Sequence, residues 1–321
     1  MKLGAGGLIR GTGLVLLVWI LSRVDGQKLK ALLCGVDLTQ LWALPLLGLA
    51  MTGVRAWRWN MLLRLQQLEL PLPRAVLLYS SGIFLGSCTP GRLGDLAKAL
   101  YLRQARGISW EKALAGSLAD RLLDLGVMVV LACWALFHLK LVAGLERWWP
   151  WLVWGLAGLG GVGWIFALKG KRAVARAVPS WLRQQPFYQF ARRMRLEMRG
   201  LASWAGVGAL GLTLLAYLLY FSQTWMIARA QGLALSAADL SAAIVLVGLA
   251  SFLPISIAGL GTREGLLIFI LGHRGVPEST EAGVAYSLLF FVTCFAFPAA
   301  VGALCWLKAP LPMSNLKELR Q

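Results

Sequence analysis

The sequence predicts an all-α polytopic membrane protein, with about six spanning helices and two oppositely oriented re-entrant helical hairpins in an inverted-repeat-like arrangement. Three observations carry this prediction. First, 58% of the 321 residues are hydrophobic and only 14% are charged, whereas a soluble domain averages about 25% charged residues. Second, several apolar runs approach the ~20 residues that cross the hydrocarbon core. Third, two shorter apolar stretches end in breaks rich in glycine and proline.

Six apolar runs are the candidates for spanning helices. They are Leu8–Leu21, Leu38–Val54, Ala113–Leu139, Trp148–Leu168, Leu201–Ala228 and Ala282–Leu307. The first run is typical of a signal peptide, but no small-x-small cleavage site follows it, so we interpret it as an uncleaved helix. The chain, 1–321, is therefore expected to form a single integral membrane domain without a soluble domain.

The formal net charge of +18 fits a membrane protein, and nucleic acid is not an expected partner. Basic residues collect in cytoplasmic loops because they resist translocation, and there they contact anionic headgroups. The loop 169–200 carries nine Lys or Arg residues against the single acid Glu197. We therefore expect a multi-pass protein of the bacterial inner (plasma) membrane with this loop and both termini in the cytoplasm. Its second half, Phe187–Met198, is predicted to form a basic amphipathic helix on the inner leaflet.

The two short apolar stretches are Ala75–Cys88 and Leu240–Leu253. Each holds about 14 residues, a length that suits a re-entrant element better than a full span. The orientation of the basic loops makes the first stretch enter from the cytoplasm and the second from the periplasm. Such a matched, interrupted pair indicates a substrate site near the bilayer midplane. The alternative is that each stretch spans with its partner, which gives about ten helices.

The break after the first stretch reads Pro90-Gly91-Arg92-Leu93-Gly94-Asp95. Its glycines let backbone N–H groups converge on an anion, and the guanidinium of Arg92 suits phosphate. With Asp95 and Lys98 it forms a candidate binding site. The alternative is a loop turn in which Arg92 pairs with Asp95.

Asp120, Arg121 and Asp124 lie near the start of an apolar helix. The two acids are four residues apart and share a helix face. There they could take up protons or clamp the basic residues of the first motif, and Arg121 could reach carboxylates on a neighbouring helix. The alternative is a structural ion pair near the cytoplasmic boundary.

The segment 55–60 places Arg55 and Arg58 one turn apart on one face. Trp57 and Trp59 fit an aromatic belt at the membrane interface. Snorkelling at a helix end is the favoured interpretation for Arg58, whereas Arg55 lies deeper and is the better candidate for binding a headgroup phosphate.

The break after the second stretch contains Gly259, Gly261, Arg263 and Glu264, and it is the counterpart of the first break. Backbone flexibility again precedes an Arg/acid pair, so these four residues are candidates for substrate binding. The alternative is a helix contact of the small-xxx-small type.

Catalytic and metal-binding patterns are not found in the sequence. The five cysteines show no CxxC spacing, and the two histidines are isolated, so no disulfide framework, metal or cofactor is expected. No Ser/His/Asp or Cys/His constellation is present. We therefore expect a protein that is not an enzyme, although an intramembrane enzyme could act through Asp95, Asp120 or Asp124.

These motifs together resemble the lysylphosphatidylglycerol synthase transmembrane region, also called the flippase-like domain family. The resemblance rests on the segments 55–59, 89–98, 119–124, 253–264 and 275–277, and it spans most of the chain. It implies a membrane domain that moves lipids, here as a stand-alone member without the synthase domain. The site residues that it implies are Arg55, Arg92, Asp95, Asp120, Arg121, Asp124, Gly259, Gly261 and Glu264.

The chain departs from the family pattern at two places. The expected Pro-Gly-Gly before the second break reads Ser256-Ile257-Ala258-Gly259, and Ser287 follows Tyr286 where relatives often place an arginine.

The leading functional hypothesis is a flippase that moves an anionic phospholipid, or a lipid-linked substrate of the glycolipid, polyprenyl-phosphate or hopanoid type. Its partners would be membrane lipids with anionic headgroups, and also an envelope-lipid biosynthetic enzyme. The alternatives are an intramembrane lipid-modifying enzyme, and a scaffold whose loop 169–200 recruits an envelope enzyme.

Overall fold

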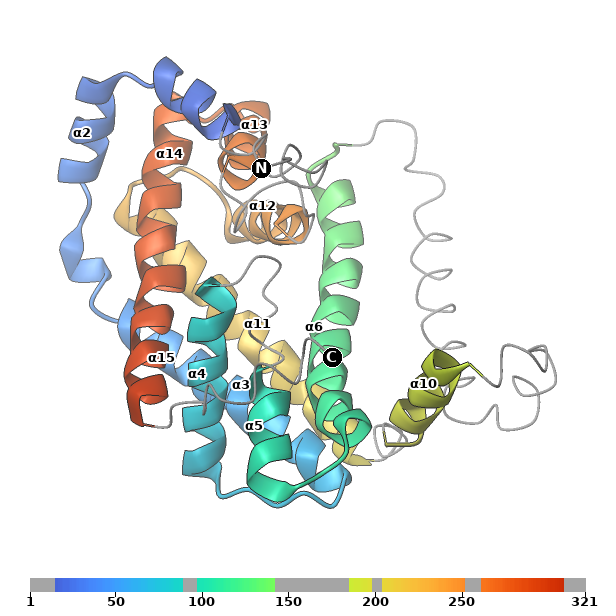
Figure 1. Cartoon of the computed structure of the whole chain (residues 1–321). Coiled ribbons are helices and arrows are strands. Elements are labelled where there is room, and N and C mark those ends of the chain that lie inside the picture. Colours follow the sequence, from blue (N-terminus) through green and yellow to red (C-terminus); the bar gives the residue numbers. More distant parts are fainter. Residues whose placement is uncertain (1–14, 89–96, 142–184, 198–203, 252–260, 309–321) are drawn as a thin grey trace, which may run out of the picture.

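The chain forms a bundle of helices of unequal length (Figure 1). The computed structural model describes residues 15–88, 97–141, 185–197, 204–251 and 261–308. Within these ranges every regular element is helical, which confirms the all-α membrane class. The elements are α2 (Gly26–Cys34), η1 (Leu38–Gln40), α3 (Leu44–Leu65), α4 (Leu72–Cys88), α5 (Ala97–Arg106), α6 (Trp110–His138), α10 (Pro186–Glu197), α11 (Trp204–Ala230), α12 (Ala237–Ala250), α13 (Thr262–His273), α14 (Ser279–Phe290), η5 (Phe291–Ala296) and α15 (Phe297–Lys308).

Three helices in the described part of the chain are long and apolar enough to cross a membrane. They are Trp110–His138, Gly206–Ala230 and the continuous helix Ser279–Lys308, and they coincide with three of the six predicted spans. A fourth candidate is the pair Gly26–Cys34 and Leu38–Leu65, which is bent by 59°. The predicted span Trp148–Leu168 and the first half of Leu8–Leu21 lie outside the described residues.

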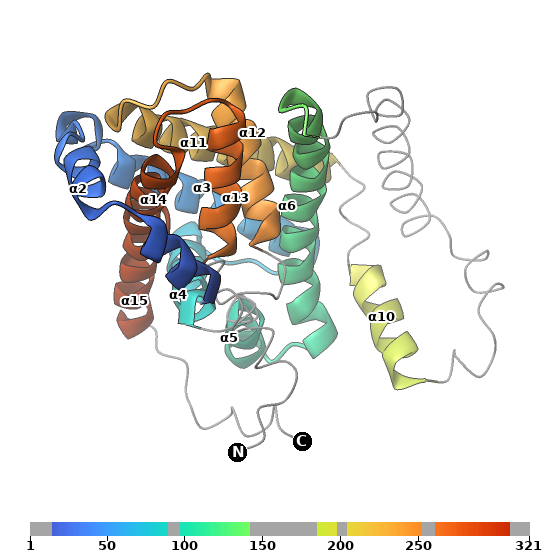
Figure 2. The same ribbon diagram turned by 90° about the horizontal axis from the view of Figure 1, so that it is seen from above.

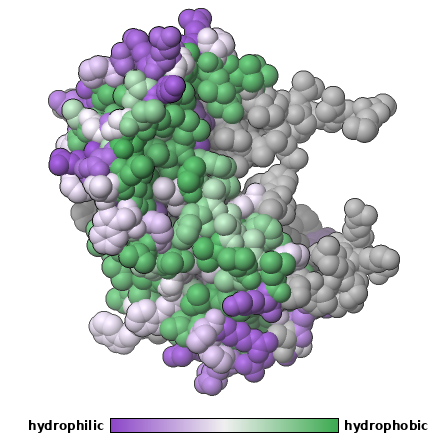
Figure 3. Space-filling model, turned by 90° about the vertical axis from the view of Figure 1, so that its left-hand side faces the viewer, coloured by the Kyte–Doolittle hydropathy of each residue, from purple (hydrophilic) through white to green (hydrophobic). Residues whose placement is uncertain are grey.

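The surface has the pattern that a bilayer requires. Figure 3 shows hydrophobic residues in a band across the middle of the molecule and hydrophilic residues gathered at its two ends. Since lipid tails solvate apolar side chains, exposed leucine, valine and tryptophan residues on this band cost little in a membrane. The protein is therefore a multi-pass membrane protein.

Helices α3, α6 and α11 form the centre of the bundle, and α3 runs antiparallel to both of the others. A Cβ at Gly116 of α6 would lie 2.9 Å from the Cδ2 of Leu63, and a Cβ at Gly208 of α11 would lie 2.7 Å from the Cε of Met61. Glycine at these two positions thus allows both helices to approach α3 closely. Figure 2 shows α3 and α11 lying together behind α14.

The first predicted hairpin consists of α4 and α5, which lie side by side. A Cβ at Gly82 would come within 2.9 Å of the Cγ of Lys98. At the base of the hairpin, where the chain enters α4 and leaves α5, the Nη2 of Arg106 donates to the carbonyl oxygen of Glu69 over 2.5 Å. Both ends of the hairpin therefore lie together, next to the start of α6.

The second predicted hairpin consists of α12 and α13, and it joins the opposite end of α6. Asp239 in the first turn of α12 contacts His138, the last residue of α6, over 2.9 Å, and also Arg274, which follows α13. The Nε2 of His273 lies 3.0 Å from the carbonyl oxygen of Leu139. The two hairpins are thus attached to opposite ends of one helix, as the inverted arrangement requires (Figure 1).

The lengths of the hairpin arms agree with the re-entrant interpretation. The arms contain 10 to 17 residues, and at 1.5 Å per residue they reach about 15–26 Å. The hydrocarbon core is about 30 Å thick. By the same measure, the 29 residues of α6 extend over roughly 43 Å.

The helix Ser279–Lys308 contains a π-helical turn, η5, between α14 and α15. Before this turn α14 packs on α13, where a Cβ at Gly283 would lie 2.7 Å from the Cγ1 of Ile268. After it, α15 packs on α4, and the rings of Trp306 and Phe84 lie 5.8 Å apart. One long helix therefore contacts both hairpins.

The predicted basic helix is present as α10. Arg193 of α10 forms an ion pair with Glu111, in the first turn of α6, over 3.1 Å. This contact places α10 at the same end of α6 as the base of the first hairpin.

Candidate functional site

The first charged centre is organised by Arg58, whose side chain is fully buried. Its Nε donates to the Oδ1 of Asp120 over 2.9 Å, and its Nη1 donates to the Oδ1 of Asp124 over 2.5 Å. Asp120 and Asp124 are four residues apart on α6, so both carboxylates face α3 as predicted. One guanidinium thus holds both acids of the motif.

This position corrects the interpretation of Arg58 as a snorkelling residue. Arg58 lies within α3 and not at its end, and its neighbour Trp59 is also fully buried, so only the exposed Trp57 remains available for an interfacial belt. The physical reason is the pairing with two carboxylates, which offsets the cost of removing a guanidinium from water.

Lys98, from the start of α5, is the second cation of the centre. Its Nζ lies 3.1 Å from the Oδ2 of Asp120, so this acid bridges Arg58 and Lys98. The ammonium also lies 4.1 Å from the ring centre of Tyr79 and 5.6 Å from that of Trp59, at cation–π distance. Asp120 therefore clamps a basic residue of the first hairpin, one of the roles that the sequence left open.

Helix α11 completes the centre with two polar side chains that sequence analysis missed. The Nη1 of Arg58 donates to the Oγ1 of Thr213 over 2.9 Å, and the hydroxyl of Tyr217 donates to the carbonyl oxygen of Asp124 over 3.1 Å. Their spacing of four residues in an otherwise apolar run could have identified them, because it places both on one helix face.

Arg55 lies one turn before Arg58 on α3 and within electrostatic range of Asp124. Its Nε is buried without a hydrogen-bond partner among the described residues. Arg121 acts on the same carboxylate. Within the described part of the chain, cations therefore outnumber carboxylates in this centre, and Arg55 keeps hydrogen-bonding capacity for an anion.

The second charged centre lies at the start of α13. Gly261 has a φ of +85°, which glycine adopts readily, and its N–H donates to the Oε2 of Glu264 over 2.6 Å. The Nε and Nη2 of Arg263 donate to the Oε1 of the same carboxylate over 3.0 and 2.6 Å. Both side chains are buried, so the predicted Arg/acid pair forms inside the protein.

Arg263 also faces the aromatic residues at the start of η5. Its guanidinium lies 5.4 Å from the ring centre of Phe290 and 6.0 Å from that of Phe291. Arg55 and Arg263 both act electrostatically on Cys294, which lies on η5. Both charged centres therefore lie within electrostatic range of the π-helical turn.

Three predicted site residues, Arg92, Asp95 and Gly259, lie outside the described residues. The other eight fall in the two centres: Arg55, Lys98, Asp120, Arg121, Asp124, Gly261, Arg263 and Glu264. Within the described ranges, no three His, Cys, Asp or Glu side chains gather as a metal site would require.

A search of curated proteins found none that matches this chain. The family model of the lysylphosphatidylglycerol synthase TM region matches residues 4–302. This match covers both charged centres and both hairpins, and therefore the chain belongs to the lysylphosphatidylglycerol synthase TM region family, a membrane domain of lipid-related proteins.

Proposed function

We propose that the protein is a lipid flippase, which moves an anionic phospholipid or a lipid-linked phosphate across the membrane. The observation that carries the proposal is the buried centre around Arg58, in which Arg55 has no hydrogen-bond partner for its Nε among the described residues. Ionisable groups inside a membrane protein are costly and commonly mark a substrate path.

The chemistry of the centre fits a phosphate headgroup. Arg58 is occupied by Asp120, Asp124 and Thr213, so it acts as a fixed positive scaffold. The Nε of Arg55 has no hydrogen-bond partner among the described residues, and a guanidinium can give a phosphate two parallel hydrogen bonds. The acyl chains would stay in the lipid while the headgroup enters between the helices.

The path continues from the first centre to the second in this proposal. Arg263 is held by Glu264 near η5, and it offers a second positive site close to Cys294. An anion that leaves Arg55 would thus meet another guanidinium before it leaves the protein. Arg92, which lies outside the described residues, belongs to the same proposal on sequence grounds alone.

The proposal is tested by leaflet exchange in reconstituted vesicles. A fluorescent phosphatidylglycerol would be placed in one leaflet, and its transfer followed by dithionite quenching. We expect Arg55→Gln to slow the transfer by about tenfold or more, because one charge-assisted hydrogen bond contributes at least about 1.5 kcal/mol. A fluorescent phosphatidylcholine serves as the uncharged reference lipid.

The matched control is Arg229→Gln. Arg229 is exposed in the last turn of α11 and stacks on Trp225 at 5.4 Å, far along the helix from Thr213. This variant removes the same charge outside the centre and should transfer lipid at the normal rate. Equal rates for both variants would exclude Arg55 from the path.

An enzymatic role is distinguished from transport by lipid analysis. Mass spectrometry of cells that lack the protein, combined with leaflet-specific labelling, would show an unchanged lipid set with an altered distribution if the protein transports. Loss of one lipid species would instead favour the intramembrane enzyme.

A further inference from the structure

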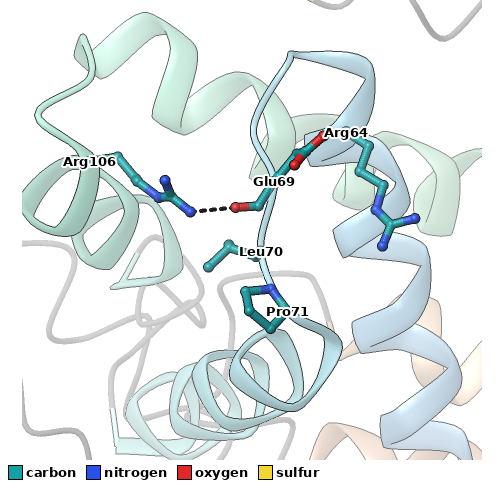
Figure 4. Close-up of a pocket in the computed structure, with 5 residues that line it drawn as sticks. All are labelled: Arg64, Glu69, Leu70, Pro71 and Arg106. Atoms are coloured by element: carbon teal, nitrogen blue, oxygen red, sulfur yellow. Dashed lines mark hydrogen bonds between the residues drawn. The ribbon is translucent and has the colours of Figure 1, made fainter.

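A pocket of about 610 Å³ lies at the base of the first hairpin, apart from both charged centres. It is lined by Arg64, Glu69, Leu70, Pro71 and Arg106 (Figure 4). Pockets of roughly 300–1,000 Å³ are the usual size for small-molecule ligands. The pocket is therefore large enough for a lipid headgroup.

The walls of the pocket come from three separate elements. Arg64 belongs to the last turn of α3, and Arg106 belongs to the last turn of α5. Between them runs the connection from α3 to α4, which supplies the other three residues (Figure 4). Leu70 and Pro71 provide the apolar part of the lining.

The charges of the pocket favour an anion. Arg106 uses one donor on the carbonyl oxygen of Glu69, and its remaining N–H groups are not used in any hydrogen bond within the described residues. The side chain of Arg64 is exposed and makes no hydrogen bond or ion pair with the described part of the chain. The residues that line the pocket include two arginines and one carboxylate, that of Glu69, so the lining has a net positive charge.

We propose that this pocket binds the phosphate headgroup of an anionic phospholipid in the leaflet that faces the base of the first hairpin. The assignment rests on the proposed function, since it supplies the position where a lipid binds before it reaches Arg55. The sequence predicts that this end faces the cytoplasm, where anionic lipids concentrate. Headgroup binding would also stabilise the base of the hairpin, because Arg106 already connects α5 to the α3–α4 connection.

The test measures binding directly and not transport. The purified protein in neutral detergent would be titrated with dihexanoyl phosphatidylglycerol, and native mass spectrometry would count the bound molecules. Dihexanoyl phosphatidylcholine and inorganic phosphate are the two comparison ligands. We expect phosphatidylglycerol to bind, phosphatidylcholine to bind at least about tenfold more weakly, and inorganic phosphate to compete only at much higher concentration.

Two substitutions in the pocket have opposite expected effects. Arg64→Gln should weaken phosphatidylglycerol binding by about tenfold, which corresponds to about 1.4 kcal/mol. Glu69→Gln removes the single carboxylate and should strengthen binding by about threefold. A gain in affinity cannot result from misfolding, so this variant keeps the test decisive if an arginine variant is unstable.

Arg74→Gln is the matched control. Arg74 is exposed in the first turn of α4, three residues after Pro71, but it does not line the pocket. Unchanged binding in Arg74→Gln separates the pocket from general attraction to a basic surface. The proposal is overturned if Arg74→Gln and Arg64→Gln weaken binding equally, or if Glu69→Gln has no effect.

The outcome is independent of the central site. Arg55→Gln should leave binding at the pocket unchanged while it slows leaflet exchange. If Arg64→Gln abolishes the bound lipid but the unmodified protein exchanges no lipid between leaflets, the pocket stands and the flippase proposal fails. If inorganic phosphate binds as tightly as phosphatidylglycerol, the pocket is a phosphate site and the lipid assignment is wrong.

Discussion

At the scale of single residues, Arg58 determines whether two carboxylates can remain inside the membrane domain. We predict that Arg58→Met lowers the free energy of unfolding by about 3–5 kcal/mol, because Asp120 and Asp124 then lose their buried counter-ion. Unfolding in mixed SDS and dodecyl maltoside micelles measures this loss. Arg229 is exposed, so Arg229→Met should change the free energy of unfolding by less than about 1 kcal/mol. A similar loss in both variants would contradict the role of Arg58.

The two carboxylates of the first centre, Asp120 and Asp124, do not take part equally in its ion pairs. Asp120 neutralises both Arg58 and Lys98, whereas Asp124 contacts Arg58 and is partly exposed. Asp120→Asn should therefore destabilise the protein more than Asp124→Asn, by roughly 1–3 kcal/mol. The same micelle titration compares the two variants, and the reverse order would show that Asp124 carries the larger share.

The sequence predicted the residues of the first centre better than it predicted their depth. The spacing of Asp120 and Asp124, and of Arg55 and Arg58, identified the faces that now meet. The burial of Arg58 could not be predicted, because it depends on partners 62 and 66 residues away. From local hydropathy alone, an arginine in an apolar segment is expected at the end of a helix, where its guanidinium can reach water.

At the scale of the elements, the contact between α15 and α4 depends on Gly302. A Cβ at this position would overlap the carbonyl oxygen of Ser80 and approach the Cβ of Phe84 to 3.0 Å. We predict that Gly302→Ala lowers the free energy of unfolding by about 1–3 kcal/mol, as overpacking does. Gly53→Ala is the control, since its Cβ meets nothing within 4 Å, and alanine there should stabilise α3 by up to about 1 kcal/mol. Two losses of equal size would contradict the close packing.

The base of the second hairpin depends on Asp239, which contacts both His138 and Arg274. Asp239→Asn should weaken the attachment of α12 and α13 to α6. Hydrogen exchange followed by mass spectrometry should show amides of α12 and α13 exchanging roughly tenfold faster, which corresponds to about 1.4 kcal/mol. Protection of α3 and α11 should remain unchanged, and uniform acceleration across the chain would instead indicate global destabilisation.

The hairpins illustrate what an apolar pattern can predict. Their short lengths and their glycine-rich breaks predicted the arms, and the distribution of basic residues among the loops predicted their opposite orientation. The contacts that close each base, between Arg106 and Glu69 and between Asp239 and His138, join residues 37 and 101 positions apart. No sequence periodicity contains that information, because it arises only when the bundle forms.

At the scale of the whole molecule, the orientation of the bundle is a prediction from its basic residues. Cys34 on α2 is exposed, and Lys28 of the same helix pairs with Glu278, just before α14, over 2.9 Å. This is the end opposite to Arg106. We predict that a membrane-impermeant maleimide added to intact spheroplasts labels Cys34, and that it labels Arg106→Cys only after the membrane is opened. Cys34→Ser removes the first signal, and the reverse pattern would invert the topology.

The π-helical turn η5 also fixes the rotational phase of the last span. An α-helix advances about 100° per residue, and a π-helical turn contains one additional residue. If the same residues were wound as a regular α-helix, the additional residue would turn α15 by about a quarter of a revolution relative to α14. Gly302 would then point away from Ser80, so the π-helical turn keeps one continuous helix in register with the first hairpin and the second at the same time.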